Sequence, residues 1–269
     1  MIQIRRFLPF GSLLIAFGFA FAAATASAQS LWMPRGNDHG VMIEVVKPSL
    51  DGVDEKFASL ATFIATRTPP SSGISLVAEI SFARSAISTV TSFTFGNLYF
   101  GMEAGGRSTP LFGELGIHLP TAAGADGDAW ITGLVSDLTR REAFFNNVLS
   151  VNAALNARRV TSKGVFYRLR LSPVLTIPAE ELGDPELFAV YSGQIGYEGS
   201  ALRLGVGLIA RTLVTEDIGS FADRSETQAE FHADFGSGAA RPGFDLKIPL
   251  GDLGETVPVV VGASLGFSY

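Results

Sequence analysis

The sequence contains no cysteine and little charge, and most of it lacks long apolar runs. Without cysteine, neither a disulfide framework nor a thiolate metal site can form. Beyond the N-terminal segment, no apolar run approaches the roughly 18 residues that a membrane-spanning helix needs. The remaining chain is therefore not a helical membrane protein. The net charge of −6 also disfavours nucleic acid as a partner, because binding phosphates requires clustered Lys and Arg.

The composition is nevertheless more apolar than that of most soluble domains. Apolar residues make up 47% of the chain and charged residues only 17%, with 30 glycines and 21 phenylalanines. A transmembrane β-barrel explains this combination, because apolar residues at alternate positions face lipid without forming continuous runs. The sequence therefore predicts an all-β fold, an antiparallel up-and-down transmembrane β-barrel.

The N-terminal segment has the organisation of a secretory signal peptide. Arg5 and Arg6 precede an almost wholly apolar stretch, and the small residues of Ala26-Ser27-Ala28 provide a cleavage site. We expect a cleavable signal peptide at 1–28. An uncleaved membrane anchor is the alternative, since the apolar stretch is nearly long enough to span a bilayer.

Residues of alternating polarity recur through the rest of the chain. In 164–176, Val165 and Leu169 share one face, while Arg168 and Arg170 share the other. Only a strand separates the two sets in this way, because its successive side chains point to opposite faces. Further strands are predicted at 41–46, 74–83, 92–104, 111–120, 129–136, 149–157, 187–198, 200–212, 225–235, 243–250 and 257–269.

These segments predict a barrel of about twelve strands over 29–269, with ten or eight as alternatives. An even number returns both termini to the periplasm. Residues 29–56 are assigned to a periplasmic N-terminal stretch and the first strand, and 54–67 could form either a helix or a strand. The longer polar connections, such as 137–146 and 213–224, are expected on the extracellular side, although 120–128 is long for a periplasmic turn.

Charged residues on the predicted inward face are candidates for lining the lumen. They permit two interpretations: opposed charged walls along a solute path, or ion pairs that fill a plugged barrel. We favour the channel. The candidates are Glu114, His118, Arg168, Arg170, Arg203, Arg211, Glu226, Glu230, His232, Asp234, Asp245 and Lys247.

The same residues give little support for catalysis or metal binding. A Ser–His pair built on His118 or His232 would suit a lipid hydrolase, but no local catalytic signature accompanies either histidine. A metal site is also considered on one strand face, where ligands two residues apart are separated by about 7 Å and would need partners from adjacent strands. Its residues are Glu226, Glu230, His232 and Asp234. We predict no catalytic residue, no metal site and no cofactor.

The C-terminal strand resembles the last strand of Gram-negative outer-membrane barrels. Leu265, Phe267 and Tyr269 stand at alternate positions and the chain ends on an aromatic residue. In that family, this strand is read by the barrel-assembly machinery. The resemblance implies that these three residues form an assembly signal and that the protein lies in the cell outer membrane, in contact with lipid and lipopolysaccharide.

A second resemblance covers 93–120, from Phe-Thr-Phe-Gly-Asn-Leu-Tyr-Phe-Gly-Met-Glu to Phe-Gly-Glu-Leu-Gly-Ile-His-Leu-Pro-Thr. These residues look like paired strands of small-solute channels linked to phenol degradation and of FadL-like and OmpW-like transporters. The expected function is a passive channel for a small solute, hydrophobic solutes included. The alternatives are an enzyme that modifies lipid or lipopolysaccharide, and a structural or adhesive barrel with a plugged lumen.

Overall fold

The computed structural model describes residues 40–51, 59–68, 71–87, 90–105, 109–122, 127–179, 183–215, 220–236 and 239–268. The signal peptide predicted at 1–28 and the C-terminal Tyr269 lie outside this part. Its strands are β1 Gly40–Ser49, β2 Leu60–Arg67, β3 Ile74–Ile87, β4 Val90–Phe95, β5 Leu98–Ala104, β6 Leu111–Leu119, β7 Val148–Val160, β8 Val165–Pro178, β9 Glu186–Glu198, β10 Leu202–Leu213, β11 Ser225–Phe235, β12 Ala240–Leu250 and β13 Val259–Ser268.

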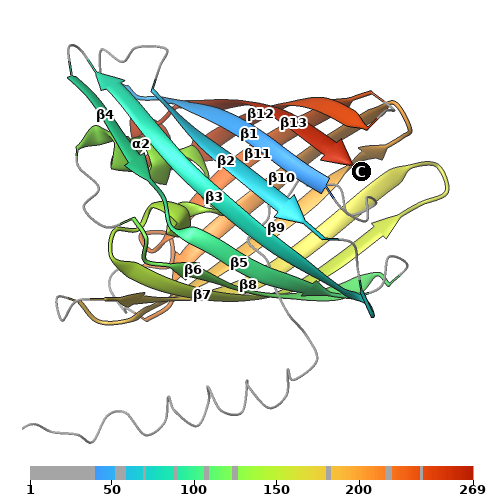
Figure 1. The fold of residues 1–269 in the computed structure, drawn as a ribbon, viewed down its shortest axis with the longest axis horizontal. Helices are drawn as coiled ribbons and strands as arrows, with labels where there is room; N and C mark the ends of the chain where they lie inside the picture. The colour runs from blue at the N-terminus through green and yellow to red at the C-terminus, as the bar shows by residue number, and fades with distance from the viewer. Residues whose placement is uncertain are drawn as a thin grey trace, which may run out of the picture.

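The described strands form a closed antiparallel barrel of twelve strands (Figure 1). Each strand pairs with its sequence neighbour in the ring, and β1 closes the ring against β13. β4 pairs only with β3 and lies outside the ring, so that β3 continues directly to β5. Closure provides every strand of the ring with two partners, which satisfies its backbone polar groups without water.

The two ends of the barrel differ in their connections. One end, here called the turn end, has the connections 68–73, 105–110, 161–164, 199–201 and 236–239. The other, the loop end, has the longer connections 120–147 and 214–224 among others. β1 begins and β13 ends at the turn end, since Gly40 pairs with Ser268. A backbone hydrogen bond from Gly199 N–H to Leu202 O closes the short hairpin between β9 and β10 there.

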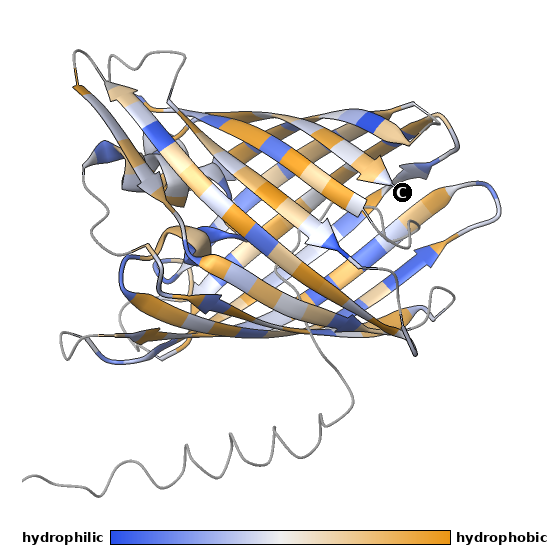
Figure 2. Cartoon of the chain, viewed as in Figure 1, coloured by the Kyte–Doolittle hydropathy of each residue, from blue (hydrophilic) through white to orange (hydrophobic). Residues whose placement is uncertain are grey.

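The outer and inner faces of the ring differ in polarity, as the period-2 pattern predicted. Figure 2 shows the alternation as bands along the strands. Leu169, Leu171 and Leu208 are exposed on the outer face, whereas Arg168 and Arg170 between the leucines of β8 are buried inside. The outer surface is thus apolar and the interior polar, which is the arrangement of a barrel that faces lipid.

One connection folds back into the loop end of the barrel. Residues 127–147, here called the inserted segment, contain α2 (Asp128–Ser136) and the 3₁₀ helix η2 (Arg141–Phe144). Phe144 packs into an apolar cluster with the inward side chains Val46, Phe63 and Val260. In Figure 1, α2 lies at the opposite end of the barrel from the end of β13. The described chain contains no helix long and apolar enough to cross a membrane.

The strand predicted at 129–136 is wrong, because this stretch forms α2. Its buried residues are Ala129, Thr132, Gly133 and Ser136, which follow the helical spacing of three and four rather than the strand period of two. The buried face consists of small residues, and a Cβ at Gly133 would overlap the Phe144 ring. An apolar residue such as Ile131 stays exposed, so the hydrophobic pattern gave no sign of this face.

The strand predicted at 92–104 is interrupted at Gly96-Asn97, which separates β4 from β5. The ambiguous segment 54–67 contains β2 over Leu60–Arg67, and therefore a strand rather than a helix there. The predicted number of twelve strands in the ring is confirmed, but it includes two errors that compensate each other. Residues 129–136 were counted as a strand, and β2 was not counted.

The assembly signal predicted at the C-terminus is partly described. Leu265 and Phe267 alternate on β13 with Gly266 and Ser268, and Phe267 is exposed on the outer face. Recognition of this strand by the assembly machinery remains a prediction.

The outer face gives a direct test of its contact with lipid. Leu171→Arg, near the middle of β8, is expected to destabilise the folded protein in lipid vesicles by about 2–4 kcal/mol, because a charge there must leave water. Val214→Arg, in the connection that follows β10, is the matched control and should change stability little. Urea unfolding of both variants in vesicles measures the difference, and equal stabilities would contradict a lipid-facing β8.

Candidate functional site

The charged residues predicted to line the lumen all lie on inward positions of β6, β8, β10, β11 and β12. All of them are buried except Glu226, which keeps 39% of its side chain exposed. Whether they contact a solute remains a prediction. The buried members are Glu114, His118, Arg168, Arg170, Arg203, Arg211, Glu230, His232, Asp234, Asp245 and Lys247.

Basic and acidic side chains of the lumen touch instead of facing each other across a gap. Glu114 on β6 lies 3.1 Å from Arg168 Nη2 and 3.0 Å from Arg170 Nε, both on β8. Arg203 Nη1 on β10 lies 3.0 Å from Asp234 Oδ2 on β11. These contacts match the ion-pair interpretation for the described state, in which guanidinium charges are compensated by neighbouring carboxylates.

The densest ion cluster surrounds Arg140 of the inserted segment, at the loop end. Arg140 Nη2 lies 2.7 Å from Glu44 Oε2 on β1 and 2.8 Å from Asp137 Oδ2, and its Nη1 lies 3.4 Å from Glu79 Oε2 on β3. Lys247 Nζ on β12 lies 2.6 Å from Asp137 Oδ2 and 3.2 Å from Glu44 Oε1. This cluster connects three strands of the ring through the inserted segment.

The Arg140 guanidinium also stacks on an aromatic ring. Its Cζ lies 3.6 Å from the centroid of Phe63 on β2, close enough for a cation–π interaction. Because Arg140 is almost fully buried, its charge depends on these neighbours rather than on water.

A second set of contacts holds η2 against β10 and β11. Glu142 pairs with Arg211 of β10, and Arg141 pairs with Glu226 of β11. The Arg211 Cζ also lies 4.0 Å from the Phe188 ring centroid. The inserted segment is thus attached by ion pairs to β1, β3, β10, β11 and β12.

Asn97 attaches the same segment through neutral hydrogen bonds. Its side-chain amide donates to the carbonyls of Glu142 and Phe145, each at 2.8 Å. The Asn97 Oδ1 accepts from the backbone N–H of Ala122 at 2.9 Å. The break between β4 and β5 therefore provides a polar anchor inside the barrel.

The carboxyl groups of the inserted segment are held in their charged form. Burial alone would raise the pKa of Asp137, but Lys247 and Arg140 outweigh burial and hold that pKa well below its usual range. Burial would likewise raise the pKa of Glu142, but Arg211 keeps it lowered. Both carboxylates are therefore ionised at neutral pH.

The two inward histidines have different surroundings. His232 Nδ1 lies 2.5 Å from Asp245 Oδ1, and its Nε2 lies 2.9 Å from Asp234 Oδ1. His118 lies opposite Ser150 on β7, and no hydrogen bond joins these two described side chains. Within the described ranges, no group of three or more His, Cys, Asp or Glu side chains is arranged to hold a metal ion.

Sequence reasoning missed the residues that bring the inserted segment into the lumen. Glu44 and Glu79 follow the inward alternation of their strands, so the signal that identified the other lumen charges was present for them too. Asp137, Arg140 and Glu142 were assigned to a polar loop outside the barrel. Phe144 and Phe145, directly after these charges, were the available signal that the segment packs against apolar surface.

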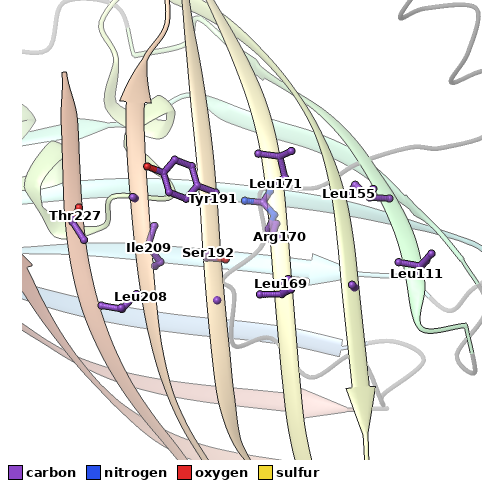
Figure 3. Close-up of a pocket in the computed structure, with 13 residues that line it drawn as sticks. Leu111, Leu155, Leu169, Arg170, Leu171, Tyr191, Ser192, Leu208, Ile209 and Thr227 are labelled. Carbon is purple, nitrogen blue, oxygen red and sulfur yellow. The ribbon is translucent and has the colours of Figure 1, made fainter. Parts of the chain in front are cut away.

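The barrel also has an apolar groove on its outer face, lined by residues of β6 to β11. Figure 3 shows Leu169 and Leu171 on β8 and Leu208 on β10 around it. Gly193 and Ala157 contribute little side-chain volume to the groove. Because its leucines belong to the outer face, we expect lipid chains rather than a transported solute to contact it.

Comparisons with known proteins identify the architecture. No family model matches the chain, and no curated protein matches it. Among solved structures, the chain is similar to an outer membrane channel from Pseudomonas putida F1, with 12% identity and a TM-score of 0.59. The match covers 90% of this chain and 99% of that one.

Two porins are also similar. NanC porin matches with 9% identity and a TM-score of 0.52 over 85% of this chain and 98% of its own. KdgM porin matches with 10% identity and a TM-score of 0.51 over 85% of this chain and 99% of its own. At such low identity these matches concern the fold, and the chain has the β-barrel fold of outer-membrane channels and porins.

Proposed function

We propose that the protein is a passive outer-membrane channel for a small polar solute, closed at the loop end by the inserted segment in the described state. The observation that carries the proposal is a charged interior within a ring whose outer face is apolar. The outer face suits contact with lipid and lipopolysaccharide, and the interior suits a polar path.

The charged interior favours polar solutes over the hydrophobic solutes that the sequence also allowed. Inward positions on β6, β8 and β10 to β12 carry charges along the lumen, and an apolar solute would have to displace water from them. Two apolar clusters of the interior include residues of the inserted segment and so belong to the closure. One surrounds Phe144, and the other joins Leu138 to inward side chains of β8 to β10, namely Phe166, Val174, Val190 and Ile209.

The orientation follows from the two ends of the barrel. Outer-membrane barrels have short periplasmic turns and longer extracellular loops. We therefore place the turn end, with the beginning of β1 and the end of β13, in the periplasm and the inserted segment near the cell surface.

Closure depends on ion pairs that are complete only when the segment is docked. Removing one partner of a buried ion pair costs about 3–5 kcal/mol, because it leaves the other charge unpaired in the interior. The Arg140 cluster and the Glu142–Arg211 pair are both of this kind. Opening therefore requires these charges to regain water or other partners.

The first test compares conductance in planar lipid bilayers. Arg140→Ala removes the described ion pair of Glu79 and leaves Glu44 and Asp137 with Lys247 as their described cationic partner, so we expect the segment to undock and single-channel conductance to rise severalfold. Arg159→Ala, at an exposed position of β7, is the matched control and should conduct like the wild type.

Trypsin gives an independent readout of undocking. In Arg140→Ala the bond after Arg141 should become cleavable, whereas the docked wild-type segment should resist. Cleavage of the variant without any gain in conductance would show that the segment does not close a channel.

The second test uses the lowered pKa values of Asp137 and Glu142. Carboxylates with a lowered pKa contribute stability that is complete above their unfolded pKa of about 4 and is lost as pH falls through the folded pKa. We expect wild-type conductance to stay low from pH 7 to pH 5 and to rise only well below pH 4.

In Glu142→Gln, Arg211 loses its charged partner, and conductance at pH 7 should already be raised. Opening between pH 7 and pH 5 that persists in Glu79→Gln, which removes the other carboxylate paired with Arg140, would contradict closure by Asp137 and Glu142, since neither titrates in that range.

A further inference from the structure

Among the described residues, five buried polar side chains on the inner wall of β7 and β9 have atoms without a hydrogen-bond partner. Ser150 Oγ and Asn152 Oδ1 lie nearer the loop end, whereas Asn156 Nδ2, Ser192 Oγ and Gln194 Nε2 belong to side chains that lie beside arginines of β8. Each side chain is at least nine-tenths buried. Leaving a buried polar atom unsatisfied is costly, so their presence on one wall indicates a missing partner.

The strand register brings the last three of these side chains together around two arginines. Asn156 pairs across to Arg170 on β8, and Arg170 pairs across to Ser192 on β9. Two residues earlier on β8, Arg168 pairs with Gln194 on β9. Cross-strand neighbours on one face lie about 5 Å apart, so these three side chains and the two arginines form one continuous surface, here called the donor row. Figure 3 shows Arg170 and Ser192 on neighbouring strands.

Existing contacts fix which atoms remain available. Arg168 Nε and Nη2 donate to Asn156 Oδ1 at 2.9 and 2.5 Å, which occupies the acceptor of that amide and leaves its NH₂ group. Glu114 accepts from Arg168 Nη2 at 3.1 Å and from Arg170 Nε at 3.0 Å. The donor row and Glu114 together hold two guanidinium groups and one carboxylate.

These properties select the charge of a ligand. The two unpartnered amide nitrogens are donors, and the Ser192 hydroxyl can also donate. A cation would meet N–H groups and two guanidinium charges, whereas an oxyanion would meet donors and a net positive charge. Carboxylate and phosphate groups share this chemistry, and both suit a guanidinium-lined surface.

We propose that the donor row is a binding site for a small carboxylate or phosphate anion within the lumen. This proposal rests on the proposed channel function, because small anions would then be the class of solute that enters the barrel. It lies on the wall formed by β7, β8 and β9, apart from the Arg140 cluster that attaches the inserted segment to β1, β3 and β12.

Calorimetric titration of the full-length protein in detergent tests binding directly. The probes are succinate, inorganic phosphate and putrescine, a four-carbon dication that matches succinate in length with the opposite charge. We expect succinate or phosphate to bind and putrescine not to bind, and the stronger anion identifies the preferred group. The same titrations are repeated with Arg140→Ala, in which the inserted segment should no longer obstruct the loop end.

The double variant Ser192→Ala/Gln194→Leu removes donors while retaining both arginines. We expect its anion affinity to fall at least tenfold, whereas Arg159→Gln, outside the lumen, should bind like the wild type. Heat-dependent mobility on SDS gels verifies that each variant is folded.

Three results would overturn the anion site: no binding of either anion to the wild type or Arg140→Ala, equal binding of putrescine, or unchanged affinity in the folded double variant. The first would mean that water alone satisfies the donor row. Bilayer currents separate this proposal from the channel. Currents without anion binding refute the anion site alone, while anion binding without currents in the wild type or Arg140→Ala refutes the channel.

Discussion

A guanidinium group removed from water must be surrounded by acceptors, and Arg140 imposes this requirement on the loop end of the barrel. Its neighbours come from distant parts of the chain, with Glu44 on β1, Glu79 on β3 and Asp137 beside it in sequence. Buried ion pairs contribute little net stability compared with apolar packing, but an incomplete set is strongly unfavourable. The cluster therefore specifies one position for the inserted segment, and the apolar contacts of Phe144 support the same position.

The ring itself follows a different constraint. A strand in lipid must pair its backbone on both sides, and the contact of β1 with β13 satisfies this requirement around the whole circumference. Since side chains alternate, the lipid-facing leucines of β8 leave every second position free for charge. A shift of one residue in register would exchange Leu169 and Arg170 between lipid and lumen, so the polarity pattern also fixes the register.

The amino-acid pattern sufficed to predict the barrel, because a strand with one apolar face has an unambiguous period. It also identified inward residues such as Arg168, Glu114 and Lys247, whose positions follow from that period alone. It did not identify α2, whose buried face is made of small residues such as Ala129 and Gly133 that carry no hydrophobic signal.

The sequence did not predict the partners of Arg140, for a different reason. The pairing of Arg140 with Glu44 joins residues far apart in the chain, and nothing local indicates that a polar connection turns inward rather than outward. Outside the strands there is no period-2 pattern to assign side chains to a face. Complementary charges alone do not indicate which residues contact each other.

The inserted segment lies within a single connection, between β6 and β7, and the hydrogen bonds that pair those strands lie within the strands themselves. The ring and its obstruction are thus encoded in different stretches of the chain. For the proposed channel, substitutions in 127–147 can change what passes through the barrel while leaving the strand pairing intact. Permeability and assembly are then separable traits, and the first can diverge between descendants that share the second.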